Sequence, residues 1–247
     1  MIFTKTIDFN FFSKKIKMII FDYFYAKEHN IKDYNYDVIS KCLESKNNCW
    51  EPYQTEITKE ILKNGNNIFI DVGTHLGYYS LIASSLGNNV IGIDCSDIYI
   101  DLFKKNIDLN NLKNIKILKN MVDSNFSLDT IIDVNTKIKL IKCDIEGYEI
   151  EFVKSIQTRL ENKTIENLIL EISPTKRNEY NETIKSIFYL GYHVYDIGLS
   201  PQRKLNEDIS LSSLKDKYLD LNNINIDDYL TSFPQKQSNF LFSLEKY

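Results

Sequence analysis

Residues 67 to 94 constrain the fold more than any other stretch of the chain. A short apolar run ends at Asp71, two glycines follow at Gly73 and Gly77, and a second apolar run ends at Asp94 after an apolar, helix-like segment. This order predicts a strand, a glycine loop, a helix and a second strand, the unit with which α/β proteins bind nucleotide-like ligands. The glycines do not have the G-x-G-x-x-G spacing of dinucleotide sites. The sequence therefore favours a nucleoside without phosphates.

The residues of this stretch fit a particular kind of nucleoside. Gly73 lets the backbone approach a ligand closely, because a side chain there would occupy the ligand's place. Asp71, at the end of the first strand, can accept a hydrogen bond from an ammonium group. Asp94, roughly 20 residues beyond the loop, can accept both hydroxyls of a ribose. S-adenosylmethionine (SAM) offers both an ammonium group and a free ribose diol. The alternative interpretation is that the chain has this kind of sheet but does not bind such a ligand.

Composition argues against several classes of protein. The 247 residues fit one α/β domain with additions. Lys and Arg total 30 against 34 Asp and Glu, which gives a net charge of −4 without a long basic block, so a nucleic-acid partner is disfavoured. The four cysteines are scattered, with no C-x-x-C pair. This pattern is typical of reduced thiols and predicts a soluble, cytoplasmic protein.

Residues 1–48 precede the nucleoside-binding unit and are expected to form a helical extension. Their apolar residues lie roughly at helical spacing and predict two helices. Interspersed lysines argue against a membrane-spanning helix and a signal peptide. Packing onto the core is the favoured interpretation, ahead of a homodimer contact or a helix on a membrane surface. Residues 49–247 then form the second unit, in which Trp50 is either a hydrophobic anchor or a lid over the ligand.

A second informative stretch runs from Ile138 to Glu151, where a strand is expected to lead into a turn and a helix. Lys142 and Asp144 are two residues apart and share a face of the strand. Glu146 and Glu149 fall in the turn and the first helical turn, where acids can simply cap a helix. Three acids and a lysine around a glycine, at the edge of the sheet where α/β proteins bind ligands, indicate a functional site.

Other residues have two open interpretations each. Met121, after the third strand, packs on an adenine or only fills space. Glu171 lies near the end of a later strand. Residues 198–236 form a polar insertion that either selects the acceptor or is a solvated loop. Asn106 and Asn110 lie one helical turn apart and are expected to cap or close a helix rather than to contact a ligand.

Together these motifs resemble the FkbM family of SAM-dependent methyltransferases. The resemblance covers roughly Trp50 to Leu244 and depends on the order of the following motifs: Asp71-Val72-Gly73, Gly77-Tyr78-Tyr79-Ser80, Asp94, Asn106, Asn110, Leu128-Asp129, Lys142 to Glu149, Glu171 and Gly191-Tyr192. His75 stands where the family commonly has Asn, and Asp94-Cys95 replaces Glu-Pro. The resemblance implies a Rossmann-like class I methyltransferase fold, with a seven-stranded, mostly parallel sheet, an antiparallel last strand and helices on both faces.

The motifs and the resemblance assign roles to individual residues. SAM is the expected cofactor, and the residues expected to bind it are Asp71, Gly73, His75, Gly77, Tyr78, Asp94, Cys95, Met121 and Asp144. Because the sulfonium is already activated, the protein needs mainly to align an acceptor oxygen and to take its proton. Asp144 is the first choice for the catalytic base or orienting group, with Glu146 second and Lys142 as electrostatic partner. His75 is a competing base, and Asp144 with Glu171 can instead hold Mg²⁺.

The resemblance also implies O-methylation of a small hydroxylated acceptor, a sugar or a nucleotide sugar. Three alternatives are open: an RNA ribose methyltransferase, a non-catalytic binding module that keeps the fold, and a nicotinamide-dependent oxidoreductase. The acidic balance counts against RNA, and the glycine spacing counts against nicotinamide. The presence of Asp71, Gly73, Asp94 and Asp144 together argues weakly against a module without turnover.

Overall fold

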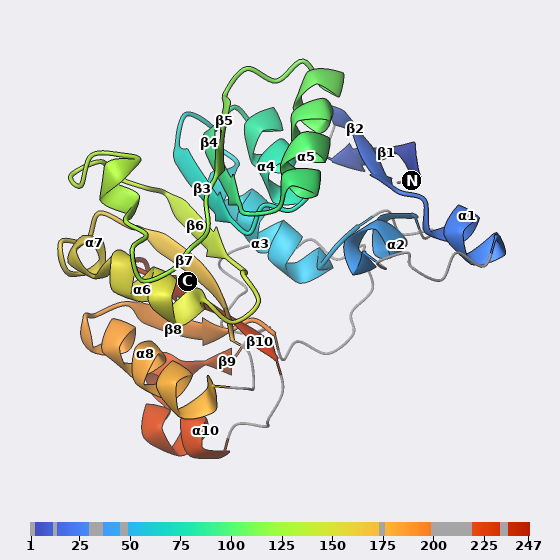
Figure 1. The fold of residues 1–247 in the computed structure, drawn as a ribbon. Coiled ribbons are helices and arrows are strands. Elements are labelled where there is room, and N and C mark those ends of the chain that lie inside the picture. The colour runs from blue at the N-terminus through green and yellow to red at the C-terminus, as the bar shows by residue number, and fades with distance from the viewer. Residues whose placement is uncertain are drawn as a thin grey trace.

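The centre of the protein is one twisted sheet of eight strands (Figure 1). The computed structural model describes residues 3–11, 14–29, 37–44, 49–172, 176–198, 219–232 and 237–247. Across the sheet the strands follow the order β5 (Ile115–Lys119), β4 (Asn89–Asp94), β3 (Ile68–Val72), β6 (Leu140–Cys143), β7 (Asn167–Ile172), β10 (Ser238–Ser243), β8 (His193–Asp196) and β9 (Leu219–Asp220). Strands β5 to β7 are parallel, and β10 runs antiparallel to both of its neighbours. The predicted sheet and its antiparallel last strand are confirmed, and the two-residue β9 adds an eighth strand.

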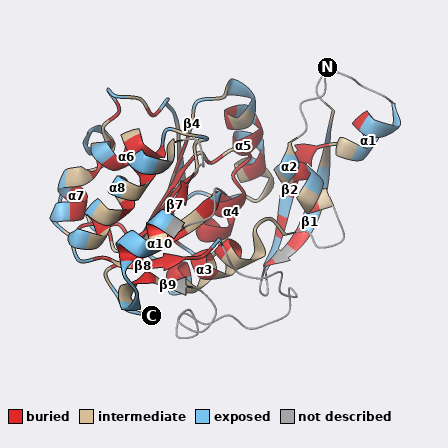
Figure 2. Ribbon diagram, turned by 90° about the horizontal axis from the view of Figure 1, so that it is seen from below, coloured by how far each residue is buried: buried red, intermediate tan, exposed pale blue. Residues whose placement is uncertain are grey.

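Helices cover both faces of this sheet. One face packs against α3 (Pro52–Leu62), α4 (Tyr78–Ser85) and α5 (Asp97–Leu109). The other packs against α6 (Glu149–Ser155), α7 (Gln157–Glu161), α8 (Arg177–Tyr189) and α10 (Ile226–Ser232). Figure 2 shows buried residues along the strands and on the inward sides of these helices. The two layers explain why the central strands are continuous apolar runs.

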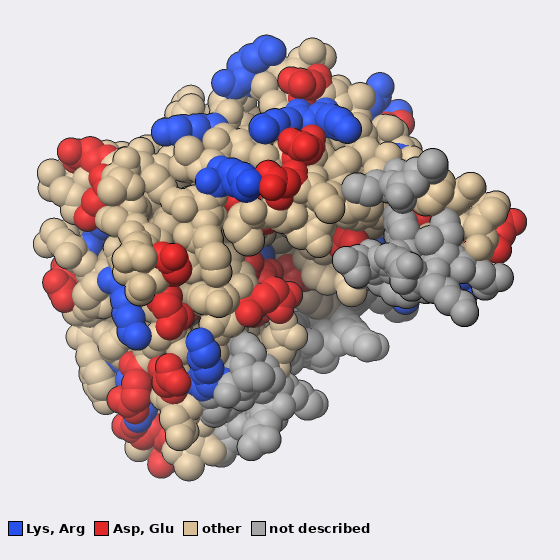
Figure 3. All heavy atoms as spheres, in the orientation of Figure 1, with Lys and Arg blue, Asp and Glu red and all other residues tan. Residues whose placement is uncertain are grey.

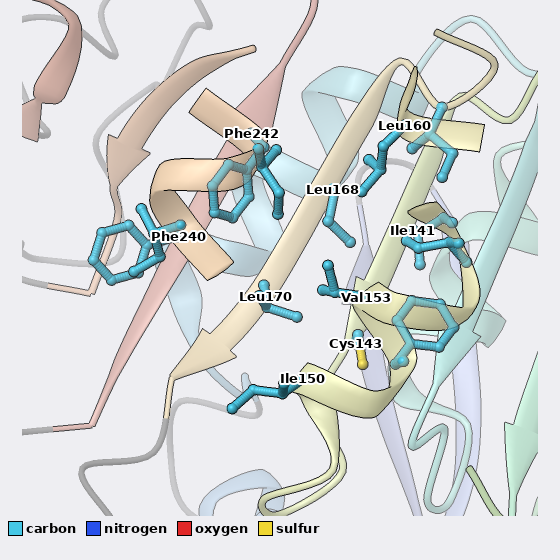
Figure 4. Close-up of a cluster of buried hydrophobic side chains, with 14 of the residues drawn as sticks. Ile141, Cys143, Ile150, Val153, Leu160, Leu168, Leu170, Phe240 and Phe242 are labelled. Atoms are coloured by element: carbon cyan, nitrogen blue, oxygen red, sulfur yellow. The ribbon is translucent and has the colours of Figure 1, made fainter. Parts of the chain in front are cut away.

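Alternate residues of the central strands belong to the two hydrophobic clusters. Phe69 packs in the cluster with α3 and α4, whereas its neighbour Ile70 packs in the opposite one. Figure 4 shows part of that opposite cluster, where Ile150 and Val153 of α6 lie over the strands. A few buried polar residues in these strands, among them Asp71 and Lys142, have polar partners. The remaining positions are apolar, because successive side chains of a strand point to opposite faces and both faces are buried here. This is the physical reason that the short apolar runs could be assigned as strands.

The N-terminal extension is only partly helical. Residues 4–11 and 14–21 form an antiparallel pair, β1 (Thr4–Phe11) and β2 (Lys14–Phe21), so the prediction of a helix there is wrong. Short helices follow, α1 (Tyr23–Glu28) and α2 (Val38–Glu44). The buried residues of β2 alternate, as Ile16, Met18 and Ile20. They pack in the same cluster as α4 and α5, so packing onto the core is the correct interpretation of the apolar stripe.

Asn106 and Asn110 attach this extension to α5. Asn110 Oδ1 accepts from the Lys17 backbone N–H at 2.8 Å, and its Nδ2 donates to the Lys17 carbonyl at 2.6 Å. Asn106 makes the same two bonds to Ile19, at 2.6 and 3.2 Å. Two side-chain amides on one helix face therefore satisfy two residues of the β2 edge as a neighbouring strand would. The expectation that the asparagines cap or close the helix is confirmed for Asn110, the C-cap residue of α5, and is wrong for Asn106, which lies within the helix.

The polar insertion is described only in part. Residues 199–218 and 233–236, where acceptor selection was predicted, lie outside the described residues. The remainder holds β9, a 3₁₀ turn η4 (Leu221–Asn223) and α10. Among the described residues no helix is long and apolar enough to cross a membrane.

Candidate functional site

A cavity of about 610 Å³ opens at the carboxyl ends of the parallel strands. Its volume lies in the range of small-molecule sites. Predicted site residues that line it are Gly73, His75, Asp94, Cys95, Met121, Asp144, Glu146 and Glu171, and further lining residues include Asp37, Val38, Ile39, Trp50, Tyr99, Ile145, Tyr148 and Gln237. In Figure 3 acidic atoms gather around a hollow near the centre of the face in view. The structure thus brings the two predicted motifs to one edge of the sheet.

The glycine loop is fixed by close backbone contacts. A Cβ at Gly73, whose φ is +81°, would lie 1.8 Å from the carbonyl oxygen of Asp144. A Cβ at Gly77 would lie 2.0 Å from the ring of Phe103. Both glycines are therefore required by neighbouring parts of the protein: Gly73 by the loop after β6, and Gly77 by α5. The first contact joins the two halves of the site.

Asp94 is held rigidly at the cavity wall. Its Oδ2 accepts from the His75 backbone N–H at 2.9 Å, and its Oδ1 accepts from the Ser96 backbone N–H at 2.9 Å. A carboxylate has about four acceptor positions, so two backbone bonds leave room for a ligand diol. Cys95 and Met121 lie on the same wall and are exposed.

Four predicted site residues do not line the cavity. Asp71 is buried behind the loop, where its Oδ2 accepts from Thr74 at 3.0 Å and from Ser80 at 2.7 Å. Tyr78 contacts Cys49 and the backbone of Trp50, and Gly77 and Lys142 also lie behind the wall. The sequence predicted that Asp71 contacts an ammonium group of the ligand; in the structure its carboxylate instead bonds to the glycine loop and to the helix that follows it.

Lys142 neutralises a group of buried acids. Its side chain is fully buried, its Nζ lies 2.8 Å from Asp144 Oδ2, and it sits 4.8 Å from the centre of the Tyr79 ring. Burial opposes its charge, but Asp144, Glu51 and Asp71 together raise the pKa of Lys142 above its ordinary value. Lys142 is consequently a cation throughout the physiological range.

Asp144 and Glu171 share one proton. Burial favours the neutral form of both, yet Lys142 and a hydrogen bond from Glu171 hold the pKa of Asp144 at about 2. Burial and the neighbouring Asp144 charge raise the pKa of Glu171 to about 9. Because the lysine contacts Asp144, the negative charge resides on Asp144 and the proton on Glu171.

The same carboxylates form a cluster of oxygen ligands. One oxygen each from Asp144, Glu146 and Glu171 lies within 4.8 Å of the others. Glu146 has a left-handed φ of 55°, which is unusual for a residue with a side chain and places its carboxylate beside the other two. Hard oxygen donors of this kind suit Mg²⁺, so the three residues could hold a divalent cation.

Glu149, the last acid of the motif, supports the loop and does not line the cavity. Its Oε1 accepts from the backbone N–H of Ile145 at 2.9 Å and of Gly147 at 3.1 Å, and the Tyr180 hydroxyl donates to its other oxygen. One buried carboxylate thus satisfies the turn that carries Glu146. Glu149 therefore acts much as a helix-capping acid does, because it accepts hydrogen bonds from the backbone N–H groups just before α6.

Replacing Glu149 with Gln is expected to destabilise the protein by about 1–3 kcal/mol, because the amide group turns one buried acceptor into a donor that faces other donors. Chemical unfolding measures this loss. Glu161, an exposed acid that accepts from Gln157 at 2.8 Å, provides the control. Its change to Gln is expected to cost less than about 0.5 kcal/mol. Equal losses in the two variants would contradict the role of Glu149.

His75 links the glycine loop to the N-terminal extension. Its φ of 53° is left-handed, a conformation that Asn adopts more readily. Its Nε2 lies 3.5 Å from Asp37 Oδ1, and its ring lies 3.9 Å from that of Tyr99. Burial lowers the pKa of His75 against the opposing effect of Asp37, so the ring is neutral at pH 7. It therefore keeps the ability to accept a proton.

Sequence reasoning missed several residues of the wall. Asp37, Val38 and Ile39 come from the extension, and Tyr99 comes from α5. Asp37 precedes a helix, which is the ordinary position of a capping residue, and it does accept from the backbone N–H groups of Ile39 and Ser40. Nothing in the sequence indicates that this cap also reaches the glycine loop, because the contact is set by how the extension docks.

The sheet order and the position of the cavity define the class I methyltransferase fold, and comparisons with solved structures agree. A Streptococcus mutans protein assigned as a methyltransferase, solved in complex with SAH, superposes with a TM-score of 0.51 at 10% identity over 79% of this chain and 98% of that one. The METTL16 MTase domain superposes with a TM-score of 0.50 at 15% identity over 78% of this chain and 67% of that one. The chain therefore has the Rossmann-like methyltransferase fold.

Sequence comparison finds more specific but shorter likenesses. No protein-family model matches the chain. The ribosomal protein L11 methyltransferase of Lactobacillus johnsonii is 31% identical over 120 residues, which cover 48% of this chain and 30% of that protein. Its counterpart from Clostridium perfringens is 43% identical over 49 residues, 19% of this chain and 16% of that protein. The matched segments thus span less than a third of these relatives.

Proposed function

We propose that this protein is a SAM-dependent methyltransferase. The observation that carries the proposal is Asp94, a carboxylate fixed at the end of β4 by two backbone bonds, which lines the same cavity as Asp144. In this arrangement Asp94 accepts the ribose hydroxyls of SAM. Cys95 and Met121 would hold the adenine, and Gly73 would leave room for the methionine end.

The charge of the cavity supports a cationic cofactor. Asp37, Asp94, Asp144 and Glu146 all line it, whereas Glu171 holds the shared proton and Lys142 lies behind the wall. An acidic cavity attracts the sulfonium and ammonium groups of SAM and disfavours phosphates. Once the methyl group has left, adenosylhomocysteine lacks the sulfonium charge, so this attraction is weaker for the product.

Proton removal from the acceptor falls to Asp144 in this proposal. A hydroxyl that hydrogen-bonds to Asp144 attacks the methyl carbon, the carbon–sulfur bond breaks, and the electron pair stays on sulfur. As its oxygen gains a methyl group the hydroxyl becomes strongly acidic, so even a carboxylate with a pKa near 2 can accept the proton. Lys142 keeps Asp144 ionised before the reaction and holds it in place.

The acceptor has two candidates. A small hydroxylated molecule fits an acidic cavity of this size, and the resemblance of the motif from Lys142 to Glu149 to that of the FkbM family supports such an acceptor. The names of the sequence relatives favour a ribosomal component as the acceptor instead. The ribose of ribosomal RNA is one such acceptor. Labelled methyl transfer into sugars, nucleotide sugars, ribosomal RNA and ribosomal protein distinguishes the two. Transfer only into ribosomal components would overturn the small-molecule acceptor.

Mg²⁺ is a second way to use the same carboxylates. Asp144, Glu146 and Glu171 would hold the ion, which would orient acceptor hydroxyls. A metal ion displaces the proton of Glu171, so its affinity should rise as the pH approaches 9. Transfer assays with Mg²⁺ and with a chelator test this role. Equal rates in both would exclude it.

Replacing Asp94 with Ala is expected to weaken binding of SAM and adenosylhomocysteine by roughly 10- to 100-fold, because hydrogen bonds to a charged group contribute about 1.5–3 kcal/mol. Isothermal titration calorimetry measures both affinities. Asp97, three residues along the chain, is exposed and pairs with Lys119 at 2.6 Å, so Asp97→Ala is the control. If the unaltered protein bound neither ligand, the methyltransferase proposal would fail.

A further inference from the structure

The N-terminal extension supplies part of the cavity wall. Asp37, Val38 and Ile39 line the cavity beside Tyr99. Val38 is 56% exposed, although it is apolar and lies at the start of a helix. We propose that these residues of the extension enclose the nucleoside half of SAM and so determine how tightly it binds. The inference rests on the proposed cofactor and gives the extension a function of its own.

The contacts of Asp37 place this wall beside the ribose end of the cavity. Asp37 Oδ1 lies 3.5 Å from His75 Nε2, and the backbone N–H of His75 donates to Asp94 at 2.9 Å. The extension is therefore two contacts away from the carboxylate proposed to hold the ribose. The Asp37 carboxylate already accepts hydrogen bonds from the backbone N–H groups of Ile39 and Ser40. The apolar side chains that follow it, Val38 and Ile39, are therefore the ones proposed to contact a ligand.

The wall is attached firmly enough to act as part of a preformed site. The backbone N–H of Phe21, at the end of β2, donates to Ser40 Oγ at 3.1 Å, which joins α2 to the strand pair. The strand pair is held in turn by Asn106 and Asn110 of α5, through their four bonds to the β2 edge. Phe103 of the same helix packs against Gly77 in the loop. One helix thus positions both the extension and the glycine loop.

The chemistry of the wall suits the planar base of a nucleoside. Val38 and Met121 are both exposed, large and apolar, and they line the same cavity from different elements. Tyr99 adds an aromatic ring beside His75. Exposed apolar side chains grouped around a polar cavity mark a binding site, because a ligand that covers them removes their surface from water. A cavity lined by both carboxylates and apolar side chains is more complementary to a cationic nucleoside than to a sugar alone.

Binding of adenosylhomocysteine to two matched variants tests the inference. Val38→Glu introduces a charge on the proposed wall, and Ile98→Glu introduces the same charge on a 47%-exposed apolar residue of α5 that does not line the cavity. Both sites are exposed, so thermal unfolding should show that both variants fold. Adenosylhomocysteine has no sulfonium, so a new acid on the wall gains less compensating attraction than it would with SAM. We expect Val38→Glu to bind it at least about 10-fold more weakly, because the new charge is desolvated by the ligand. Ile98→Glu should bind like the unaltered protein.

The outcomes separate this inference from the proposed function. If the unaltered protein binds adenosylhomocysteine and Val38→Glu binds it within about twofold of Ile98→Glu, the wall has no part in binding and the inference alone is overturned. If the unaltered protein does not bind, the cofactor assignment fails and the inference fails with it. A third variant, Val38→Asn, distinguishes lost packing from added charge. An intermediate affinity for this uncharged variant would support contact between the wall and the nucleoside.

Discussion

Replacing Asp144 with Asn is expected to lower methyl transfer by roughly 10²- to 10⁴-fold, the contribution typical of a positioned general base. Asn is nearly the same size and keeps one oxygen toward the acceptor, but it cannot take a proton. SAM affinity should change little, because we propose that the cofactor is held mainly at Asp94. The loss therefore appears in kcat rather than in the cofactor affinity.

The matched control is Asp123→Asn, since Asp123 only accepts from the Asn125 backbone N–H at 2.8 Å and lies outside the cavity. Turnover is measured with the acceptor found by the methyl-transfer screen, and cofactor affinity is measured by calorimetry. An Asp144→Asn variant that turned over as fast as the control would remove Asp144 from the mechanism. Fast turnover of this variant combined with a slow Glu146→Gln variant would transfer the role to Glu146.

The same substitution has a consequence for Glu171. Burial comes first among the causes that raise the pKa of Glu171 to about 9, and the hydrogen bond and negative charge of Asp144 follow. Asp144→Asn removes the charge and leaves the burial, so the pKa of Glu171 should fall but stay above its ordinary value. Carboxyl ¹³C NMR titration of both proteins measures this shift. An unchanged pKa would show that the two carboxyls do not share a proton.

The sheet could be predicted from the sequence because its signals are local. Strands β3, β4, β6 and β7 are short, mainly apolar runs bounded by glycine or acid, because burial on both faces favours apolar residues at most positions. The carboxyl ends of parallel strands meet at one edge, so motifs that follow different strands had to come together. For this reason the proximity of Asp94 and Asp144 could be predicted from local sequence signals.

The extension could not be predicted because its pattern is ambiguous. Phe9, Ile16 and Ile20 satisfy a helical spacing, whereas Ile16, Met18 and Ile20 satisfy the alternation of a strand. Contacts with α5 select the strand over the helix, because its Asn106 and Asn110 form hydrogen bonds to the backbone edge of β2. A helix has no such edge to offer. The contact that selects the strand is therefore about 90 residues away in sequence and has no local signal.

The individual roles of the acids could not be predicted from the sequence either. Asp71 and Asp94 both end a strand, yet the first is bonded to Thr74 and Ser80 behind the loop and the second faces the cavity. Asp144 and Glu149 belong to one motif and divide in the same way. Residue type and spacing identify a ligand-binding edge. Which acids support it and which face the ligand depends on side-chain packing in three dimensions.

Lys142→Met is expected to destabilise the protein by about 3–5 kcal/mol, the usual loss when one partner of a buried charge group is removed. Met fills a similar volume, so the loss reflects charge. Lys142 is 3% exposed and is the cation that offsets Asp144, Glu51 and Asp71. Without it these carboxylates remain buried with no neutralising partner, and their pKa values rise as burial then dominates.

The pH dependence of this loss separates charge from packing. With Lys142 removed, the folded state of the variant binds more protons at its buried acids than the unfolded state does, so its stability falls as the pH rises above the ordinary carboxyl pKa of about 4. The deficit relative to the unaltered protein should therefore be larger at pH 8 than at pH 5, as measured by urea unfolding. Lys139→Met is the control, because Lys139 lies just before the same strand and pairs with Glu166 at 2.6 Å in a partly exposed position. It should cost less than about 1 kcal/mol. A loss that is the same at both pH values would assign the role of Lys142 to packing, and the low pKa of Asp144 would then need another cause.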